Sequence, residues 1–183
     1  MQVFLVRIFL IFSIVLITSC ASKLKKLSED KDIQLTGDSG YVLIGIDTNR
    51  DLYKILLDGP RRIELSSADL AEGESYILSQ LEAGEYSVDR LYVSNYMYYK
   101  FDNDDNFRFV VKPGTINYVG HLNIVTRGFW YPTSYLRLDN RSSQSLVFME
   151  DKFPSILRSR MLIYGGPGED AFYSYIDNGK GDK

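Results

Sequence analysis

The chain has 183 residues, 45% of them hydrophobic, with 21 Lys plus Arg against 24 Asp plus Glu and a formal net charge of −3. This mildly acidic balance offers no clustered basic face of the kind that nucleic-acid phosphates require, so no nucleic-acid partner is expected. A single cysteine excludes an intramolecular disulfide and a metal centre built on several cysteines. The length fits one core of ordinary size.

The first 19 residues have the order of a secretory signal peptide. Arg7 precedes a predominantly apolar stretch over residues 8–17, which Thr18 and Ser19 follow. A basic start, an apolar segment of about 7 to 15 residues and small residues before the cut are the features of such a signal. A membrane-spanning helix needs about 20 apolar residues, so the alternative of an uncleaved signal anchor is disfavoured.

The end of this segment, Ile17-Thr18-Ser19-Cys20, resembles the bacterial lipobox. The resemblance implies that the signal is cut before Cys20, that this cysteine carries lipid, and that a membrane is therefore a partner. Each buried methylene contributes about 0.8 kcal/mol, so two or three acyl chains hold a protein almost permanently. Ala21, where lipoproteins retained at the inner membrane commonly have Asp, implies the outer membrane of the bacterial envelope. The mature chain would carry 20 Lys plus Arg against 24 Asp plus Glu, because the signal removes only Arg7.

The segment after the lipid site predicts a flexible tether. Residues 20–39 are rich in Lys, Asp and Glu and contain few apolar side chains. Such a composition buries too little apolar surface to order the backbone. We therefore expect this segment to lift a folded domain, residues 40–176, away from the membrane.

Alternating apolar residues from position 41 onward predict short strands, separated by turn signals every 8 to 12 residues or so. Val42, Ile44 and Ile46 share one face, and the polar residues 47–51 predict a hairpin with a second strand at 52–57. In the strand at residues 86–93 the apolar phase shifts by one position, which predicts a β-bulge near Asp89 and Arg90. The pattern predicts an all-β fold, an antiparallel β-sandwich of about seven to nine strands with a C-terminal helix.

The C-terminal part changes to helical spacing, with Leu146, Met149, Phe153 and Leu157 on one face. Pro154 interrupts this pattern, so we expect two helical pieces or a kink near residues 152–153. A last strand is predicted at residues 161–164, and residues 177–183 are predicted to be disordered.

Two short motifs carry a resemblance to a known type of domain. LxAGxY at residues 81–86 is similar to the LxPGxY turn of transthyretin-like and carboxypeptidase-regulatory-like β-sandwich modules, with Ala83 where those modules usually have Pro. Residues 107–120, with the pattern FxVxPGxxxYxG, and the lipobox resemble a group of uncharacterised bacterial lipoproteins built on that sandwich. These motifs report turns and core positions rather than an activity. We expect positive φ at Gly84 and Gly114, and a backbone carbonyl as the partner of the Tyr86 hydroxyl.

The sequence gives no sign of catalysis, a cofactor or a metal site. The sole histidine, His121, shares a strand face with polar neighbours and is expected to face water, and no GxSxG elbow accompanies it. Two acidic loops, at residues 47–58 and 102–113, begin like calcium loops but have Leu52 and Phe107 where the sixth position requires glycine. Residues 165–168 contain three glycines without the GK[ST] of a phosphate loop. We therefore expect no catalytic residues.

Aromatic residues supply the one candidate interaction surface. Of 14 tyrosines in the chain, four crowd around one turn: Tyr92, Tyr96, Tyr98 and Tyr99. Such clusters bind protein partners or sugars, although cross-strand packing is the alternative explanation. The sequence thus predicts a non-enzymatic envelope lipoprotein that binds or assembles with another envelope component, a protein or a glycan. The alternatives are a surface-exposed binder of carbohydrate or host protein and, more remotely, an envelope hydrolase.

Overall fold

The computed structural model describes residues 21–35, 37–101, 104–128 and 133–180, with only the backbone described at 177–180. The signal peptide and Cys20 lie outside this range. The described residues form two short 3-10 turns, η1 (Ser67–Asp69) and η2 (Asp105–Phe107), three helices and eleven strands. The strands are β1 (Ser22–Lys23), β2 (Ser39–Thr48), β3 (Lys54–Asp58), β4 (Ile63–Ser66), β5 (Gly73–Glu82), β6 (Gly84–Tyr92), β7 (Tyr98–Lys100), β8 (Arg108–Val111), β9 (Ile116–Arg127), β10 (Thr133–Asp139) and β11 (Leu162–Tyr164). The helices are α2 (Ser142–Lys152), α3 (Pro154–Ser159) and α4 (Phe172–Lys180).

The strands form two mixed sheets. Sheet A has the order β1-β4-β3-β6-β7, with β8 also paired to β6, and sheet B has the order β10-β9-β2-β5, with β11 also paired to β9. Three pairings are parallel, β1 with β4, β2 with β9, and β11 with β9. The β-rich class is therefore as predicted, but the expectation of a purely antiparallel fold with seven to nine strands is corrected.

The two sheets enclose one apolar core. Val42, Ile44 and Ile46 of β2 lie in it, as their alternation predicts, together with Ile55 and Leu57 of β3 in the other sheet. In sheet A, β4 buries alternate residues, as a strand with one core-facing side does, and the described helices pack on sheet B instead. Burying an aliphatic side chain of this size contributes about 1.5–3 kcal/mol, so this shared core is the main support of the two sheets.

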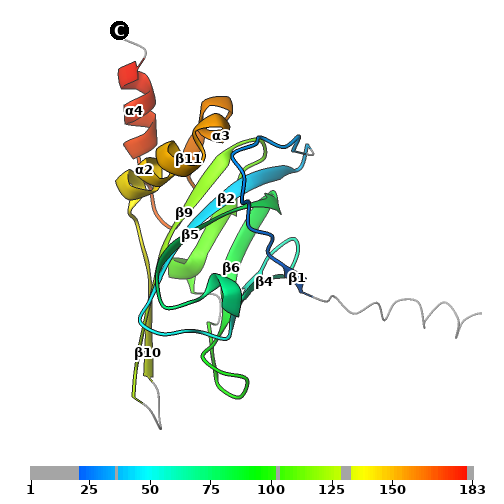
Figure 1. Cartoon of the computed structure of the whole chain (residues 1–183), viewed down its shortest axis with the longest axis vertical. Helices are drawn as coiled ribbons and strands as arrows, with labels where there is room; N and C mark the ends of the chain where they lie inside the picture. Colours follow the sequence, from blue (N-terminus) through cyan, green and yellow to red (C-terminus); the bar gives the residue numbers. More distant parts are fainter. Residues whose placement is uncertain (1–20, 36, 102–103, 129–132, 181–183) are drawn as a thin grey trace, which may run out of the picture.

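Sheet B is buried on its outer face as well. Tyr41 and Leu43 of β2 point away from the shared core and pack with Met149 of α2 and Ile156 of α3. Figure 1 shows the helices gathered over one end of β2 and β9. A strand that is covered on both faces needs a continuous apolar run, which explains the sequence of residues 41–46.

Five connections between successive described strands cross between the sheets, and two of them concern predicted turns. β2 and β3 lie in different sheets, so the hairpin predicted around residues 47–51 is wrong. The turn between β5 and β6 also passes from sheet B to sheet A, and there Gly84 has a φ of 147°. The Tyr86 hydroxyl donates a 2.9 Å hydrogen bond to the carbonyl oxygen of Glu82, as expected. Gly114 likewise has a positive φ, 73°.

Two local predictions are confirmed. Leu56 pairs with Arg90 and Leu57 with Val88, so Asp89 is the extra residue of a β-bulge in β6. The helical pattern is broken where expected, because α2 ends at Lys152 and Pro154 is the first residue of α3. Proline is tolerated there since the first N–H groups of a helix have no intrahelical acceptor.

The predicted tether is corrected, because residues 21–35 lie along the domain as an N-terminal strap. β1 extends parallel to β4 at the edge of sheet A, and Leu24 enters the shared core. Further along, the Leu27 N–H donates to the Leu78 carbonyl of β5, at the edge of sheet B. The strap therefore crosses the seam between the two sheets (Figure 1).

Acidic residues that suggested a solvated tether instead fix the end of the strap. The Asp30 carboxylate accepts hydrogen bonds from the backbone N–H groups of Ser155 (2.7 Å) and Ile156 (3.0 Å), at the start of α3. Asp32 accepts a 2.7 Å bond from Arg160 Nε and a 3.0 Å bond from the Tyr41 hydroxyl. The bond from Arg160 lowers the pKa of Asp32, against the effect of burial.

The predicted disordered tail is also corrected in part, because residues 177–180 continue α4. This helix packs on the outer face of sheet B through Tyr173, which is 5% exposed. The sequence-based prediction missed this helix because Asp177 and Asn178 are polar. The helix begins at Phe172, and its first turn contains the aromatic residues Phe172 and Tyr173. Within the described residues, no helix has the length and apolar character to cross a membrane.

Candidate functional site

The predicted tyrosine cluster lies at one edge of sheet A. Tyr92 of β6 is paired with Tyr98 of β7, and their ring centroids are 5.1 Å apart. The Tyr98 residue is 52% exposed, and Tyr96, in the turn between the two strands, is 96% exposed. Tyr99 has the opposite orientation, since it pairs with buried Leu91 and packs against the shared core. Three of the four predicted tyrosines thus remain available at the surface.

Cations from neighbouring strands flank these rings. Lys54 Nζ of β3 lies 4.8 Å from the centroid of the Tyr92 ring and 5.7 Å from that of Tyr53, which is 42% exposed. Arg90 Cζ lies 5.5 Å from the centroid of the Tyr98 ring. Such contacts contribute about 0.5–1 kcal/mol each at exposed sites and hold the rings in place.

We define the tyrosine surface by its exposed and half-buried members: Tyr53, Lys54, Arg90, Tyr92, Tyr96 and Tyr98. Sequence reasoning missed the first three because they lie up to 45 residues from the last. The start of β3 carried a weak signal, since Lys54 is the one charged residue before the buried run Ile55–Leu57. The bulge at Asp89 changes the phase of β6, so Arg90 and Tyr92 share the outward face.

His121 is not exposed, which corrects the expectation that it faces water. Its exposed fraction is 0%, and its ring lies over Gly45, the residue beside it in β2. A bulge between β2 and β9 at Val119 reverses the faces of β9, so His121 lies on the outer side of sheet B. There the ring meets the edge of Tyr76, 5.3 Å between centroids, and Tyr76 stacks on Phe148 of α2.

Charged side chains from neighbouring strands and from the start of α2 surround His121. Its Nε2 lies 3.4 Å from Oε1 of Glu74, and Arg141 lies 3.4 Å from Glu74 and 3.6 Å from Asp47. Neither ring nitrogen of His121, nor the Tyr76 hydroxyl, has a hydrogen-bond partner in the described part of the chain. Burial, and then the charge of Arg141, lower the pKa of His121. A fully buried imidazole cannot contact a substrate, so we assign His121 a structural role.

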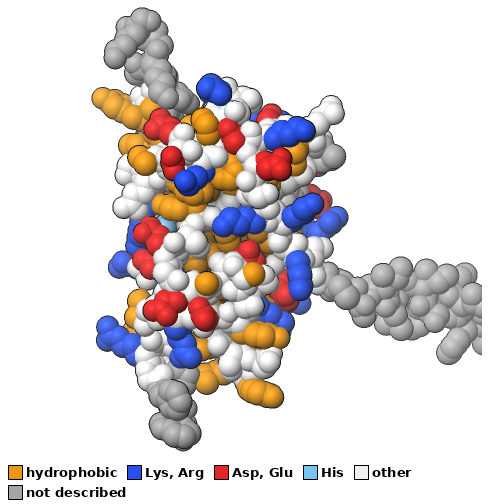
Figure 2. Space-filling view, viewed as in Figure 1, with side chains coloured by type: hydrophobic (Ala, Val, Ile, Leu, Met, Phe, Trp, Pro, Cys, Tyr) orange, Lys and Arg blue, Asp and Glu red, His pale blue; other side chains and the backbone are white. Residues whose placement is uncertain are grey.

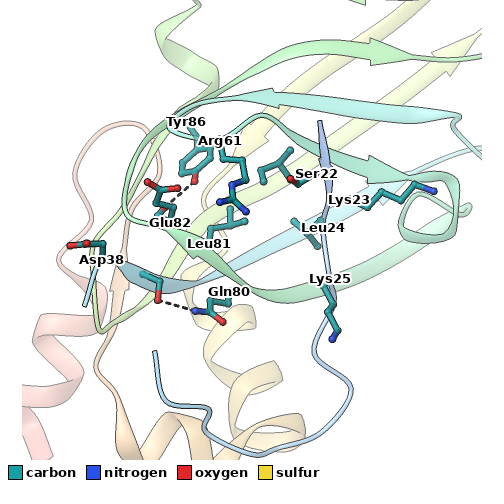
Figure 3. Close-up of a pocket in the computed structure, with 12 residues that line it drawn as sticks. Ser22, Lys23, Leu24, Lys25, Asp38, Arg61, Gln80, Leu81, Glu82 and Tyr86 are labelled. Carbon is teal, nitrogen blue, oxygen red and sulfur yellow. Dashed lines mark hydrogen bonds between the residues drawn. The ribbon is translucent and has the colours of Figure 1, made fainter. Parts of the chain in front are cut away.

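A pocket opens beneath the N-terminal strap. It has a volume of about 510 Å³ and a floor formed by Leu24, Ile63, Leu81 and Tyr86. Figure 3 shows Arg61 pointing into it, whereas Lys23 and Lys25 point away from it on the outer side of the strap. Asp38 and Glu82 also line the pocket, but the Asp38 side chain points away from Arg61 (Figure 3). The pocket therefore lacks the facing pair of carboxylates that a glycoside hydrolase uses.

Among the described residues, no group of three or more His, Asp or Glu side chains is placed to hold a metal ion. Of the first acidic loop, Asp47 contacts Arg141, and the Asp51 carboxylate accepts a bond from the backbone of Glu72. The predicted lipid site, Cys20, falls outside the range that the structure describes.

The tyrosine surface is thus an exposed aromatic cluster flanked by cations, and its geometry fits binding better than chemistry. A comparison of the whole chain with protein-family models, with curated proteins and with solved structures finds no match in any of the three.

Proposed function

We propose that this protein is a lipid-anchored lipoprotein of the bacterial envelope, held in the outer membrane through Cys20, which binds or assembles with another envelope component without catalysing a reaction. The two-sheet core and the corner at Gly84 support a transthyretin-like β-sandwich as its scaffold. The lipobox resemblance at residues 17–20 supports the anchor.

The observation that carries the binding proposal is the exposure of Tyr96 and Tyr98 beside ordered cations. Interface hot spots are enriched in Tyr and Arg, which supply a large contact area with few rotatable bonds. On the tyrosine surface the Tyr92 and Tyr98 rings already contact each other, and Lys54 and Arg90 lie against them. A partner would therefore meet a largely fixed surface and lose less conformational freedom on binding.

Replacing Tyr96 and Tyr98 by Ser tests this proposal. Partner crosslinks in intact envelopes should fall at least about tenfold, because hot-spot side chains contribute about 2 kcal/mol or more each. Tyr135→Ser is the matched control, since Tyr135 is 63% exposed but lies on β10 in the other sheet. Unchanged crosslinks in the double variant, with the chain still folded, would refute the tyrosine surface as the binding site.

The anchor has its own test. Cys20→Ala should abolish incorporation of labelled palmitate and move the exported protein out of the detergent phase, because Cys20 is the only cysteine in the sequence. Fractionation of the unaltered protein separates inner from outer membranes. Persistence of the alanine variant in the detergent phase after processing would contradict the lipid anchor.

A second candidate function is a surface-exposed binder of carbohydrate or of a host protein. Paired rings with hydroxyl edges and flanking cations also suit sugars, above all anionic ones. Binding of the purified protein to a glycan array, with loss of the signal in the Tyr96→Ser and Tyr98→Ser double variant, would favour this function over assembly with an envelope protein.

A further inference from the structure

The N-terminal strap sets how far the domain can lie from the lipid anchor. A flexible tether of about 20 residues would have a root-mean-square span of about 25 Å. Because β1 already pairs with β4 at Ser22, the free length is much shorter. Three residues of extended chain, from Cys20 to Lys23, span at most about 11 Å. An acylated Cys20 would therefore hold the edge of sheet A close to the membrane surface.

The part of the strap nearest to Cys20 carries only positive charge. Lys23, Lys25 and Lys26 are all exposed, and the first acidic residue after them is Glu29. None of the three has an ion pair with any residue in the described ranges. Leu24 points inward to the core between two of them, and Figure 3 shows Lys23 and Lys25 on the outer side of the strap.

The three acidic residues of the strap do not cancel this charge, since Glu29 lines a pocket together with Lys25, Lys26 and Lys31, and the other two are engaged elsewhere. Asp30 is engaged by the start of α3, and Asp32 by Arg160. Figure 2 shows Lys and Arg side chains at the surface of this flank of the molecule.

We propose that Lys23, Lys25 and Lys26 form a membrane-contacting surface that binds anionic phospholipid headgroups and holds the domain flat against the membrane in which Cys20 is anchored. This inference rests on the proposed lipid anchor, which brings the lysines within reach of the headgroups. Anionic headgroups attract each nearby Lys or Arg by about 1 kcal/mol, but only within a Debye length of about 8–10 Å. The docked strap satisfies that condition, and a free tether would not.

The tyrosine surface keeps its separate role in this arrangement. It lies around β6 and β7 at the opposite edge of sheet A from β1. A membrane that contacts the β1 edge would leave Tyr96 and Tyr98 directed toward other envelope components.

Chemical labelling of lysines in reconstituted vesicles tests the proposal. The full acylated protein is placed in vesicles of phosphatidylcholine alone or with phosphatidylglycerol, and the acetylation rate of each lysine is read by mass spectrometry. We expect labelling of Lys23, Lys25 and Lys26 to slow about tenfold in the anionic vesicles and to recover at 1 M salt. Lys112 and Lys152, exposed elsewhere, serve as internal controls and should change less than about twofold.

A variant with Lys23, Lys25 and Lys26 replaced by Gln gives a second measurement. Its strap should be cut faster by a protease in anionic vesicles than that of the unaltered chain, whereas Lys112→Gln with Lys152→Gln should have no effect. The mass of the purified chain reports acylation separately, so a missing anchor is recognised as such. An unacylated chain would overturn the lipid anchor and, with it, this proposal, which rests on that anchor.

Equal labelling of the strap lysines of the acylated chain in both kinds of vesicle would overturn this proposal and leave the lipid anchor standing. Protection in native envelopes but not in anionic vesicles would also overturn it, in favour of an acidic protein as the occupant of this surface.

Discussion

The outer faces of the two sheets differ in what covers them. On sheet B, α2, α3 and α4 bury Tyr41, Leu43 and Tyr118. On sheet A, the corresponding face around Lys54 and Tyr98 is open to solvent. Strands β2 and β9 of sheet B are buried on both faces, but β9 carries the polar His121 there, so residue type alone does not tell which outer face is wet. A polar residue on the outer face is therefore buried in one sheet and exposed in the other. His121 on sheet B is fully buried, whereas Tyr98 on sheet A can contact a partner.

The largest expected effect concerns the covered face. Met149→Ala should lower the free energy of unfolding by about 2–5 kcal/mol, because Met149 is 0% exposed between α2 and sheet B. Val147→Ala on the same helix is the control, since Val147 is 64% exposed and should change stability by less than about 0.5 kcal/mol. Denaturant unfolding measures both. Equal effects at the two positions would mean that the helices do not cover sheet B.

The next largest loss of stability is expected where Gly45 lies close to the ring of His121. A Cβ at position 45 would lie 2.1 Å from His121 Nδ1, so Gly45→Ala should cost about 1–3 kcal/mol through overpacking. Adding His121→Ala removes the ring, and the double variant should then lose less than the sum of the two single changes. Gly37→Ala, with nothing within 4 Å of its Cβ, is the control. Strict additivity would show that the ring does not lie over Gly45.

The pH dependence of stability should report the burial of His121. Because its pKa is lowered in the folded state, the unfolded chain binds more protons below about pH 6.5, and stability should fall as the pH falls below that value. One proton limits the slope to about 1.4 kcal/mol per pH unit. Asp32 and Asp170, whose pKa values are lowered from 3.8, lose their contribution only at more acidic pH.

Thermal or denaturant unfolding between pH 7 and pH 5 isolates this effect, since the chain has a single histidine. His121→Gln should flatten the profile in that window whatever its absolute stability. A slope that persists unchanged in the variant would place its origin elsewhere.

The smallest expected effect is on the open face. Tyr98→Ser should change stability by about 1 kcal/mol or less, because the Tyr98 residue is 52% exposed and the ring loses mainly its contacts with Arg90 and Tyr92. Tyr99→Ser, one position along the same strand, should cost several times more, since Tyr99 packs against the shared core. If the two substitutions proved equally damaging, the tyrosines would belong to the core, and the proposed binding surface would be lost.

Local features of the fold could be predicted because short-range sterics determine them. The bulge at Asp89, the break at Pro154 and the Tyr86 hydrogen bond each depend on a few adjacent residues. Pairing between distant segments could not be predicted, and the parallel neighbours β2 and β9 are an example, with Tyr41 opposite Ile116. The strap was missed for a related reason, since its acidic residues find partners in α3 that no local pattern indicates.

In the candidate site, too, the local features could be predicted from the sequence and the contacts between distant segments could not. Alternation separates outward Tyr98 from inward Tyr99, and the structure has this arrangement. The contributions of Lys54 and Arg90 depend on the pairing of β3 with β6, which the sequence does not reveal. His121 was misplaced because the bulge at Val119 and the cover from α2 both act on β9 from other segments.

The contacts of Asp30 with Ser155 and Ile156 join positions that are 125 and 126 residues apart in the chain. A chain that emerges from its N-terminus must therefore wait until α3 has appeared before the end of the strap can be fixed in place. Loop closure over such a separation makes folding slow compared with that of locally connected domains. The strap is thus the first described segment to be synthesised, and its end at Asp30 can be fixed only after α3, whereas its contacts with β4 and Leu78 need only the first half of the chain.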